Sequence, residues 1–113
     1  MTKKQEAWKW FSIFIRTRDG EYVKCVTCDN RRHWKNMDAG HWITGVHTSI
    51  KFDERNVHAQ CRNCNGPLGG NLKVYSEFMR ETYGEEVMAE LRRKSHMIIK
   101  PDYDAIIEKY KRS

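Results

Sequence analysis

The sequence lacks the features that would place it in a membrane or divide it into several domains. Its 113 residues contain no apolar run as long as the stretch of about 20 residues that a membrane-spanning helix needs. Residues 1–15 lack the small-residue cleavage pattern of a signal peptide. There is no internal repeat, no low-complexity segment and only two prolines. We therefore expect a cytosolic protein that forms one domain over residues 1–113 and has no membrane partner.

Acidic residues are in the minority. The chain has 21 Lys and Arg against 15 Asp and Glu, which gives a formal net charge of +6. Such an excess favours a polyanionic partner, because Lys and Arg release counterions from a phosphate backbone. Hydrophobic residues make up 39% of the chain, which is enough for a folded core. At this length, however, burial leaves a thin margin over chain entropy, so we expect an additional staple.

The four cysteines provide a candidate for that staple. They form two Cys-x-x-Cys pairs, Cys25 with Cys28 and Cys61 with Cys64. In a cytosolic protein such pairs bind metal more often than they form disulfides. A thioredoxin-like redox pair would need a βαβ pattern, which is absent here. Two pairs offer the four thiolates that zinc takes in a tetrahedron, and four thiolates leave no open position. We therefore predict a structural zinc site.

Hydrophobic periodicity predicts helices at both ends of the chain and short strands between them. Thr2 and Gln5 form a capping-box pattern, and apolar residues recur at helical spacing over residues 3–17. Helical periodicity returns after Asn71, a residue suited to cap a helix. Short β-favouring pieces lie around residues 34–37, 41–44, 50–52 and 57–59, and from them we expect two short strands and a loop. The expected parts are an N-terminal helix (1–20), a zinc-stapled core (21–71) and a helical C-terminal part (72–113).

The 32 residues between the cysteine pairs are more than a zinc ribbon usually contains, so we expect them to hold the chemistry. The motifs in order are Asp38-Ala-Gly-His41, Phe52-x-Glu-x-Asn56-Val-His58, Cys61-x-x-Cys64-Asn65 and Gly70-Asn71. Over residues 25–75 this order resembles the NinG/Rap family of phage recombination nucleases. It is also similar to the wider HNH, or ββα-metal, superfamily, which includes phage resolvases with a four-cysteine zinc site.

The resemblance implies a fold and an activity. The fold would be α+β, with a small ββα-metal core stapled by zinc and flanked by the N-terminal and C-terminal helices. The activity would be metal-dependent endonuclease cleavage of DNA in branched recombination intermediates, such as Holliday junctions and D-loops, in the cytoplasm of the bacterial host. The catalytic ion would be Mg²⁺ or Mn²⁺. Because a four-way junction has two-fold character, we expect a homodimer.

The resemblance also assigns roles to three residues. His41 matches the general base, which takes a proton from the attacking water. Asn56 matches the residue that pins the hairpin loop, using an amide that both donates and accepts hydrogen bonds. Asn65 matches a ligand of the catalytic metal and would bind through its side-chain oxygen, a ligand type that suits Mg²⁺ or Mn²⁺.

One further ligand of the catalytic metal is needed. In many HNH enzymes an Asp or His stands directly before the base, but here that position is Gly40. Asp38 is the first choice, because on a strand it has the same side-chain parity as position 40. His58 is the second choice. His33, His47 and Glu54 are left without a role.

Two other functions are compatible with the sequence. The chain could be a zinc-stapled DNA-binding module without catalysis, using its basic surface for phosphate contacts. It could also be a restriction or homing type of HNH nuclease that reads a base sequence, although 113 residues leave little room for a reading domain. The basic run Arg92 to Lys94 fits phosphate contacts, but a solvated helix face explains it more simply.

Overall fold

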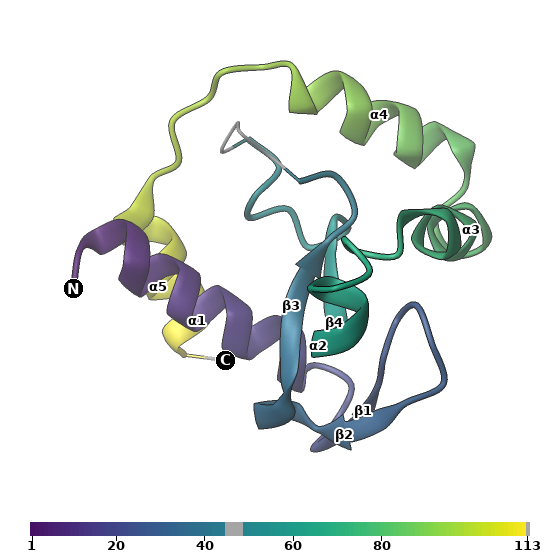
Figure 1. Cartoon of the computed structure of the whole chain (residues 1–113). Coiled ribbons are helices and arrows are strands. Elements are labelled where there is room, and N and C mark those ends of the chain that lie inside the picture. The colour runs from purple at the N-terminus through teal and green to yellow at the C-terminus, as the bar shows by residue number, and fades with distance from the viewer. Residues whose placement is uncertain (45–48, 113) are drawn as a thin grey trace.

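The computed structural model describes residues 1–44 and 49–112, which form helices around two small antiparallel sheets (Figure 1). The elements in chain order are α1 (Lys3–Thr17), β1 (Tyr22–Lys24), β2 (Arg31–His33), the 3₁₀-helix η1 (Trp34–Asn36), β3 (Met37–His41), β4 (Val57–Cys61), α2 (Arg62–Asn65), α3 (Leu72–Thr82), α4 (Glu85–Ser95) and α5 (Tyr103–Lys111). The radius of gyration of 13.7 Å agrees with the roughly 13 Å expected of a compact chain of this length. The mixed α and β composition is thus confirmed. In the described residues, none of the helices combines the length and apolarity needed to cross a bilayer.

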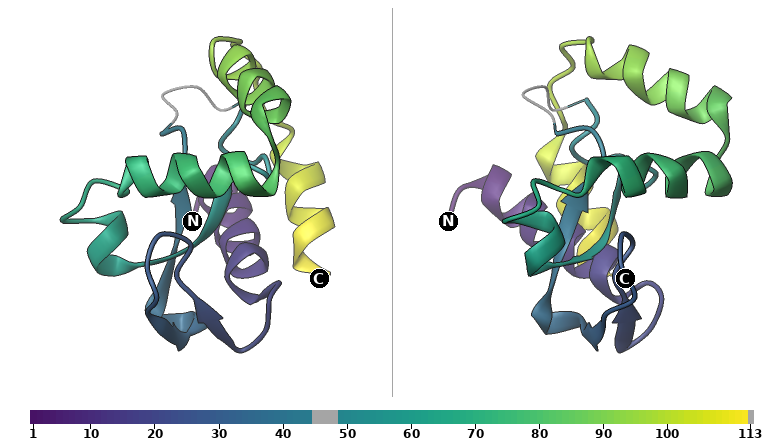
Figure 2. Two further views of the ribbon diagram at one scale, coloured as in Figure 1. Left: turned by 90° about the vertical axis from the view of Figure 1, so that its right-hand side faces the viewer. Right: turned by 45° about the vertical axis from the view of Figure 1, so that its right-hand side comes forward.

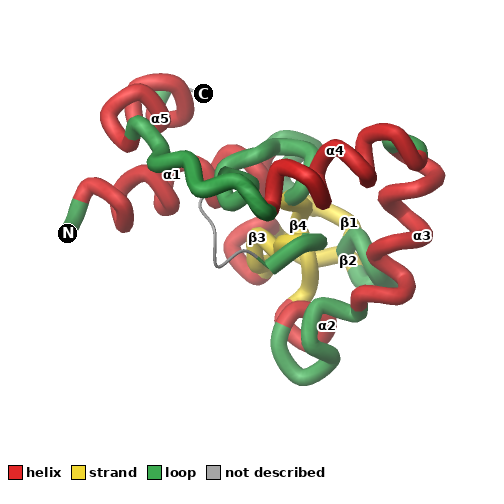
Figure 3. Tube along the Cα trace, turned by 90° about the horizontal axis from the view of Figure 1, so that it is seen from above, coloured by secondary structure: helices red, strands yellow, loops and turns green. Residues whose placement is uncertain are grey.

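Helix α1 forms as its capping residues predict. The Gln5 amide donates to Thr2 Oγ1 at 3.1 Å, and the Thr2 amide donates to the Gln5 side chain at 2.8 Å, which closes the capping box. The apolar face of α1 buries Phe11 against Val57 of β4 and against Tyr110 of α5. Helices α1 and α5 therefore lie side by side against the β3–β4 sheet (Figures 1 and 3).

Helices α3 and α4 enclose a second core on another side of the molecule. Their buried side chains pack around Trp42 and Ile50, which come from the segment between β3 and β4. The members contributed by the two helices are Tyr75, Met79, Met88 and Leu91. The segment that joins α4 to α5 then crosses back over the molecule to α1 (Figure 2). The C-terminal helices thus contact the segment between β3 and β4 at two places: α3 and α4 at Trp42 and Ile50, and α5 through the Tyr110–Glu54 hydrogen bond.

The two sheets are both antiparallel hairpins. In the first, Val23 of β1 is opposite Arg32 of β2. In the second, Asp38 of β3 is opposite Gln60 of β4, and Gly40 is opposite His58. Helix α2 begins directly after β4, so the centre of the chain has the order strand, strand, short helix.

The middle of the chain forms two short strands, β3 and β4, as expected, but not all of the β-favouring pieces become strands. Residues 34–36 form η1, because the His33 side chain accepts a hydrogen bond from the Lys35 amide at 3.2 Å and caps a helical turn. The piece at 41–44 overlaps β3 only at His41, and residues 50–52 form a turn. The strand predicted at 57–59 is confirmed and extends to Cys61. Strands β1 and β2 were not predicted, because each has only three residues and lies beside a cysteine turn.

Candidate functional site

The four cysteines converge on one point. Their sulfur atoms all lie within 4.8 Å of one another, and the Cys28 and Cys61 sulfurs are 3.7 Å apart. A tetrahedral ion with metal–sulfur distances of about 2.3 Å requires sulfur pairs to be about 3.8 Å apart. The donor set therefore fits a metal ion, with Cys25, Cys61 and Cys64 buried and Cys28 half-buried.

Backbone and side-chain amides hold the sulfurs in place. The Cys61 amide donates to Cys25 Sγ at 3.2 Å and the Cys64 amide approaches Cys61 Sγ at 3.5 Å, which is the hydrogen bonding expected of thiolates. Asn71 was expected to cap α3 with its side chain. It does stand before the helix but has φ 48° and makes no side-chain cap. Its amide instead donates to the Thr27 carbonyl at 3.1 Å and approaches Cys64 Sγ at 3.8 Å, so it ties α3 to the cysteine cluster.

The cysteine thiols differ in acidity before any ion binds. Burial raises the pKa of Cys25, but hydrogen bonds from the Cys61 amide and from Thr27 outweigh it and bring the pKa to about 7. Burial raises the pKa of Cys28 to about 12. A metal ion needs all of its ligands as thiolates, so its binding must release protons at neutral pH.

Asn56 holds together the segment between β3 and β4. Its side chain is fully buried, and Oδ1 accepts from the Ile43 amide at 2.9 Å while Nδ2 donates to the carbonyls of Ile43 at 3.0 Å and Ile50 at 3.3 Å. The Asn56 carbonyl also accepts from the Trp42 amide at 2.9 Å. An amide can close both sides of a loop in this way because it donates and accepts. Asn56 therefore fixes the backbone on both sides of the segment that follows His41.

His41 ends β3 with a defined tautomer. Its Nε2 lies 3.2 Å from the Lys51 carbonyl, and because a carbonyl only accepts, Nε2 carries the proton. In the neutral ring Nδ1 is then the free base. The ring stacks on Trp8 of α1 with centroids 5.2 Å apart. Burial lowers the pKa of His41, so the neutral form predominates at pH 7.

Asp38 and Asn65 meet beside a pocket. The Asn65 amide donates to Asp38 Oδ2 at 3.1 Å, and both side chains are half-buried. They line a pocket of about 380 Å³ between α1, β3 and α2. Trp8 also lines it, so the ring that stacks on His41 borders the same space. The other lining residues are Ser12, Arg16, Met37, Ala39 and Arg62.

His58 does not reach this pocket. It is 7% exposed and its two ring nitrogens lie 2.9 Å from the Tyr75 hydroxyl and 2.8 Å from the Tyr83 hydroxyl. Tyr75 donates its only hydroxyl hydrogen to the Gly40 carbonyl at 2.7 Å, so Nδ1 of His58 donates to Tyr75 and Nε2 accepts from Tyr83. Burial lowers the pKa of His58 to about 3. With both nitrogens engaged, His58 is unavailable to a metal, and of the two candidate ligands only Asp38 lies beside Asn65.

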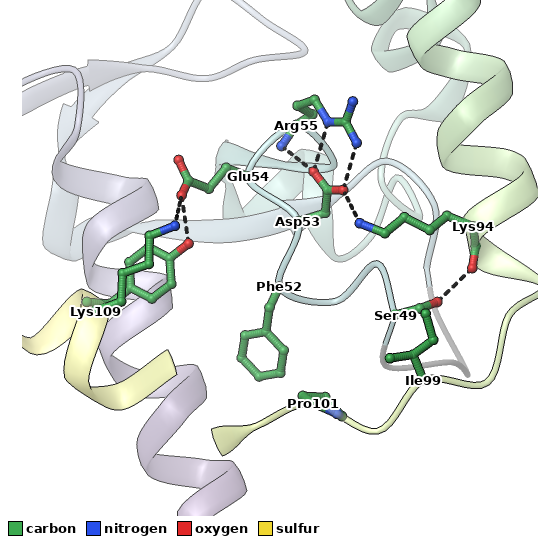
Figure 4. Close-up of a pocket in the computed structure, with 10 residues that line it drawn as sticks. Ser49, Phe52, Asp53, Glu54, Arg55, Lys94, Ile99, Pro101 and Lys109 are labelled. Carbon is green, nitrogen blue, oxygen red and sulfur yellow. Dashed lines mark hydrogen bonds and ion pairs between the residues drawn. The ribbon is translucent and has the colours of Figure 1, made fainter. Parts of the chain in front are cut away.

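A different pocket, of about 400 Å³, lies between the segment after His41 and the C-terminal helices (Figure 4). Its charges pair with one another. The Asp53 carboxylate forms ion pairs with Arg55 at 3.0 Å and with Lys94 at 2.9 Å. Burial raises the pKa of Asp53, but the hydrogen bonds from these two side chains outweigh burial and lower the pKa to about 2. Glu54 accepts from the Tyr110 hydroxyl at 2.7 Å. These residues tie the segment to α4 and α5, and the acids Asp53 and Glu54 and the bases Arg55 and Lys94 that line the pocket are all paired.

The remaining residues from the sequence analysis lie outside the Asp38–Asn65 pocket. His33 pairs with Glu21 at 3.3 Å on the β1–β2 hairpin. The guanidinium of Arg92 lies over the Trp42 ring at 5.1 Å, and Lys94 is the partner of Asp53. His47 lies outside the described residues. Trp8 and Arg16 were not predicted as site residues, and α1 brings them to the pocket from a distant part of the chain. No local pattern marks them, since both also fit an ordinary amphipathic helix.

Comparison with known proteins places the chain in a family. The model of the family described as "Bacteriophage Lambda NinG protein" matches residues 2–113. The chain belongs to the NinG family. It is 34% identical over 88 residues to "Protein ninG" of Escherichia phage 933W and 32% identical over 109 residues to "Protein ninG" of Salmonella phage P22. These matches cover 77% and 94% of this chain.

The matched relatives are longer proteins. The NinG chain described here covers 43% of the phage 933W protein and 53% of the P22 protein, so it spans about half the length of the curated relatives it matches. The protein of Escherichia phage lambda is 33% identical over 88 residues, which are 42% of its length. No solved structure matches.

Proposed function

We propose that this NinG protein is a metal-dependent DNA endonuclease. The observation that carries the proposal is the Asp38–Asn65 pair, whose side chains form a 3.1 Å hydrogen bond beside a pocket. Asn65 directly follows Cys64, the last cysteine of the cluster. Two oxygen-bearing side chains leave most of the coordination sphere of a hard cation to water and phosphate, which is how Mg²⁺ is usually held. Asn65 would bind through Oδ1 after a turn of its amide. The order β3, β4, α2 then corresponds to a ββα-metal unit.

His41 is the proposed general base. Its Nδ1 is the unprotonated nitrogen of the neutral ring, and its lowered pKa keeps it neutral at pH 7. Nδ1 takes a proton from a water whose oxygen forms a bond to phosphorus, and the bond from phosphorus to the 3′ oxygen breaks. The 3′ oxygen leaves with the electron pair of that bond and takes a proton from solvent water. The products are a 5′ phosphate and a 3′ hydroxyl. When bound at Asp38 and Asn65, Mg²⁺ or Mn²⁺ supplies the positive charge that stabilises the leaving oxygen.

The remaining residues of the proposed site hold the base and the metal ligands in place. Asn56 fixes the backbone on either side of the 41–56 segment, which includes the Lys51 carbonyl that orients His41. The four cysteines, with zinc as the proposed ion, join α2 to the turn that contains Cys25 and Cys28, and so set the position of Asn65. The substrates proposed are branched recombination intermediates, from the resemblance to phage recombination nucleases. A homodimer is proposed for the same reason.

The test is cleavage of a labelled four-way junction beside a matched linear duplex, with and without Mg²⁺ or Mn²⁺. Wild type is compared with His41→Ala and with the control His33→Ala, which removes a histidine that pairs with Glu21 on the β1–β2 hairpin and has no part in the proposed site. We expect metal-dependent cutting that His41→Ala lowers by at least about a hundredfold, while His33→Ala cuts like wild type. Zinc content is measured for each protein. An absence of cutting by zinc-loaded wild type with either metal would refute the nuclease.

The second candidate is a zinc-stapled DNA-binding module without catalysis. It is favoured by the Trp8 ring, which stacks on His41 and limits the approach of water to it. Binding of the junction without cutting under any metal would support this candidate. Replacement of Trp8 by Leu separates the two cases further, because uncovering His41 cannot create activity if the metal site is absent.

A further inference from the structure

Two arginines line the pocket that contains the Asp38–Asn65 pair. Arg16 comes from α1 and Arg62 is the first residue of α2. Arg62 also lines an adjoining pocket of about 370 Å³ beside the β1–β2 hairpin. The two pockets are therefore joined by one arginine side chain.

Arg16 is held in place before any ligand binds. Its Nε donates to Ser12 Oγ at 3.0 Å and to the Ser12 carbonyl at 3.2 Å, and its guanidinium lies over the Trp34 ring at 5.2 Å. Among the described residues, no carboxylate lies within 4.0 Å of its guanidinium, because the nearby Asp38 pairs with Arg62 at 3.7 Å. Burial lowers the pKa of Arg16, which means that the fold partly desolvates this cation. An arriving anion would offset that cost.

The adjoining pocket is lined by hydrogen-bond donors. Around buried Cys61 it presents Arg62, Arg32 and the side chains of Asn30, Asn36 and Asn63, with no carboxylate among the lining residues. The Arg32 side chain is exposed and forms its one described hydrogen bond with the Arg31 carbonyl at 2.9 Å. Guanidinium and amide groups without an acid are the groups that bind phosphate oxygens in protein–DNA complexes.

We propose that Arg16 and Arg62 bind the phosphodiester at the Asp38–Asn65 pair, and that Arg32 binds a neighbouring phosphate of the same DNA strand. The inference rests on the proposed function and adds the path that the bound DNA strand follows over the protein. The bound strand runs from α1, over α2, to the β1–β2 hairpin. A planar guanidinium can contact two phosphate oxygens at once, which a lysine ammonium cannot do in the same geometry.

The competing explanation for these cations is electrostatic. Four thiolates and one zinc ion carry a net charge of −2, and Arg32 and Arg62 lie in the pocket above Cys61. In that case replacing Arg32 would weaken zinc binding and leave DNA affinity unchanged. The phosphate proposal requires the reverse.

The first experiment measures binding of a labelled four-way junction by zinc-loaded protein over a range of salt concentrations, without Mg²⁺ or Mn²⁺. Arg32→Gln is compared with Arg31→Gln, a matched control on the same strand whose side chain is exposed but lines neither pocket. We expect Arg32→Gln to weaken binding several-fold and to reduce the slope of log affinity against log salt by about 1. Arg31→Gln should keep the wild-type slope. Equal slopes for both variants would overturn the Arg32 contact.

The second experiment measures single-turnover cleavage by Arg16→Gln and Arg16→Lys. Loss of a preorganised phosphate contact should slow the cleavage step by about a hundredfold, and Lys should recover only part of the rate. If Arg16→Gln does not fold, exposed Arg62→Gln tests the same pocket. Wild-type cleavage by a folded Arg16 or Arg62 variant would overturn the inference. If neither wild type nor any variant cleaves, but Arg32→Gln still lowers the slope of log affinity against log salt, the nuclease proposal is rejected and the proposed Arg32–phosphate contact is kept.

Discussion

The side-chain oxygen of Gln60 lies where a Cβ atom at position 40 would be. An ideal Cβ placed on Gly40 would come within 2.0 Å of Gln60 Oε1. Gln60 cannot move aside easily, because its Nε2 donates to Thr27 Oγ1 at 3.0 Å and to the Gly70 carbonyl at 2.7 Å. Glycine at position 40 is thus a packing requirement of this chain. Oε1 itself is buried and has no hydrogen-bond partner among the described residues.

This contact predicts that Gly40→Ala destabilises the protein although alanine adds one methyl group. We expect a loss of about 2 kcal/mol in the free energy of unfolding, the usual range for overpacking a closed site. Urea unfolding of zinc-loaded protein measures it. The double variant with Gln60→Ala removes the 2.0 Å clash and leaves only the 3.0 Å contact with the Cβ of residue 60, so its loss should be smaller than the sum of the two single losses. Additive losses would show that the clash is relieved in another way.

Asn56→Ala should destabilise the protein and separate the two sides of the 41–56 segment. The change leaves the Ile43 amide and two carbonyls without their buried partners. We expect a loss of about 2 to 4 kcal/mol, since each unsatisfied buried group costs about 1 to 3 kcal/mol. Asn36→Ala, at an exposed asparagine, should change stability by less than about 0.5 kcal/mol. Urea unfolding compares the two, and similar losses would contradict the pinning role.

Local patterns in the sequence predicted the helix at residues 3–17 and the grouping of the four cysteines. Capping and hydrophobic periodicity act within a few residues, and the spacing of Cys61 and Cys64 brings two sulfurs together by itself. The contacts of Gly40 with Gln60 and of His41 with Trp8 join residues far apart in sequence, and only the packed fold creates them. The β-favouring piece around Ile50 forms a turn and not a strand, because Asn56 holds the Ile50 carbonyl.

His58 predicts a dependence of stability on pH. Its pKa is about 3 in the folded protein and 6.5 in the unfolded chain, so between these values the unfolded chain binds more protons. The free energy of unfolding should therefore fall as the pH falls below 6.5, and His58 contributes up to about 1.4 kcal/mol per pH unit to this fall. Above pH 6.5, His58 should not make the free energy of unfolding depend on pH. Urea unfolding at pH 7, 6 and 5 compares wild type with His58→Gln.

The variant is needed because the cysteine thiolates also take up protons in acid. That contribution is common to both proteins, so the difference between the two curves isolates His58. The His58→Gln curve should be flatter between pH 5 and 6.5. Parallel curves would show that His58 is protonated in the folded protein over this range.

The stacking of Trp8 on His41 predicts a titration that NMR can follow without any assay of activity. Burial lowers the pKa of His41, so its ring signals should titrate below 6.5, the ordinary value. Trp8→Leu exposes more of the His41 ring and should move its midpoint upward. An unchanged His41 midpoint in the Trp8 variant would remove burial by Trp8 as the cause.

Removal of the proposed zinc ion should dismantle the cysteine cluster and the elements it joins while α1 remains helical. The cluster connects the turn after β1 to the end of β4 and to α2, and the small core around Val23 and Met37 is built on the same cysteines. Without the ion, the bonds between metal and sulfur that hold the four cysteines together are lost, so metal binding is coupled to folding.

Helix α1 does not depend on the cysteines, because it packs through Phe11 on Tyr110 of α5. Chelation followed by amide hydrogen exchange should therefore show loss of protection in β4 and α2 first. Adding zinc back at pH 7 should release protons, because burial raises the pKa of Cys28 to about 12 and that thiol must ionise to bind. A chelated protein with unchanged exchange in β4 and α2 would show that the fold does not depend on the ion.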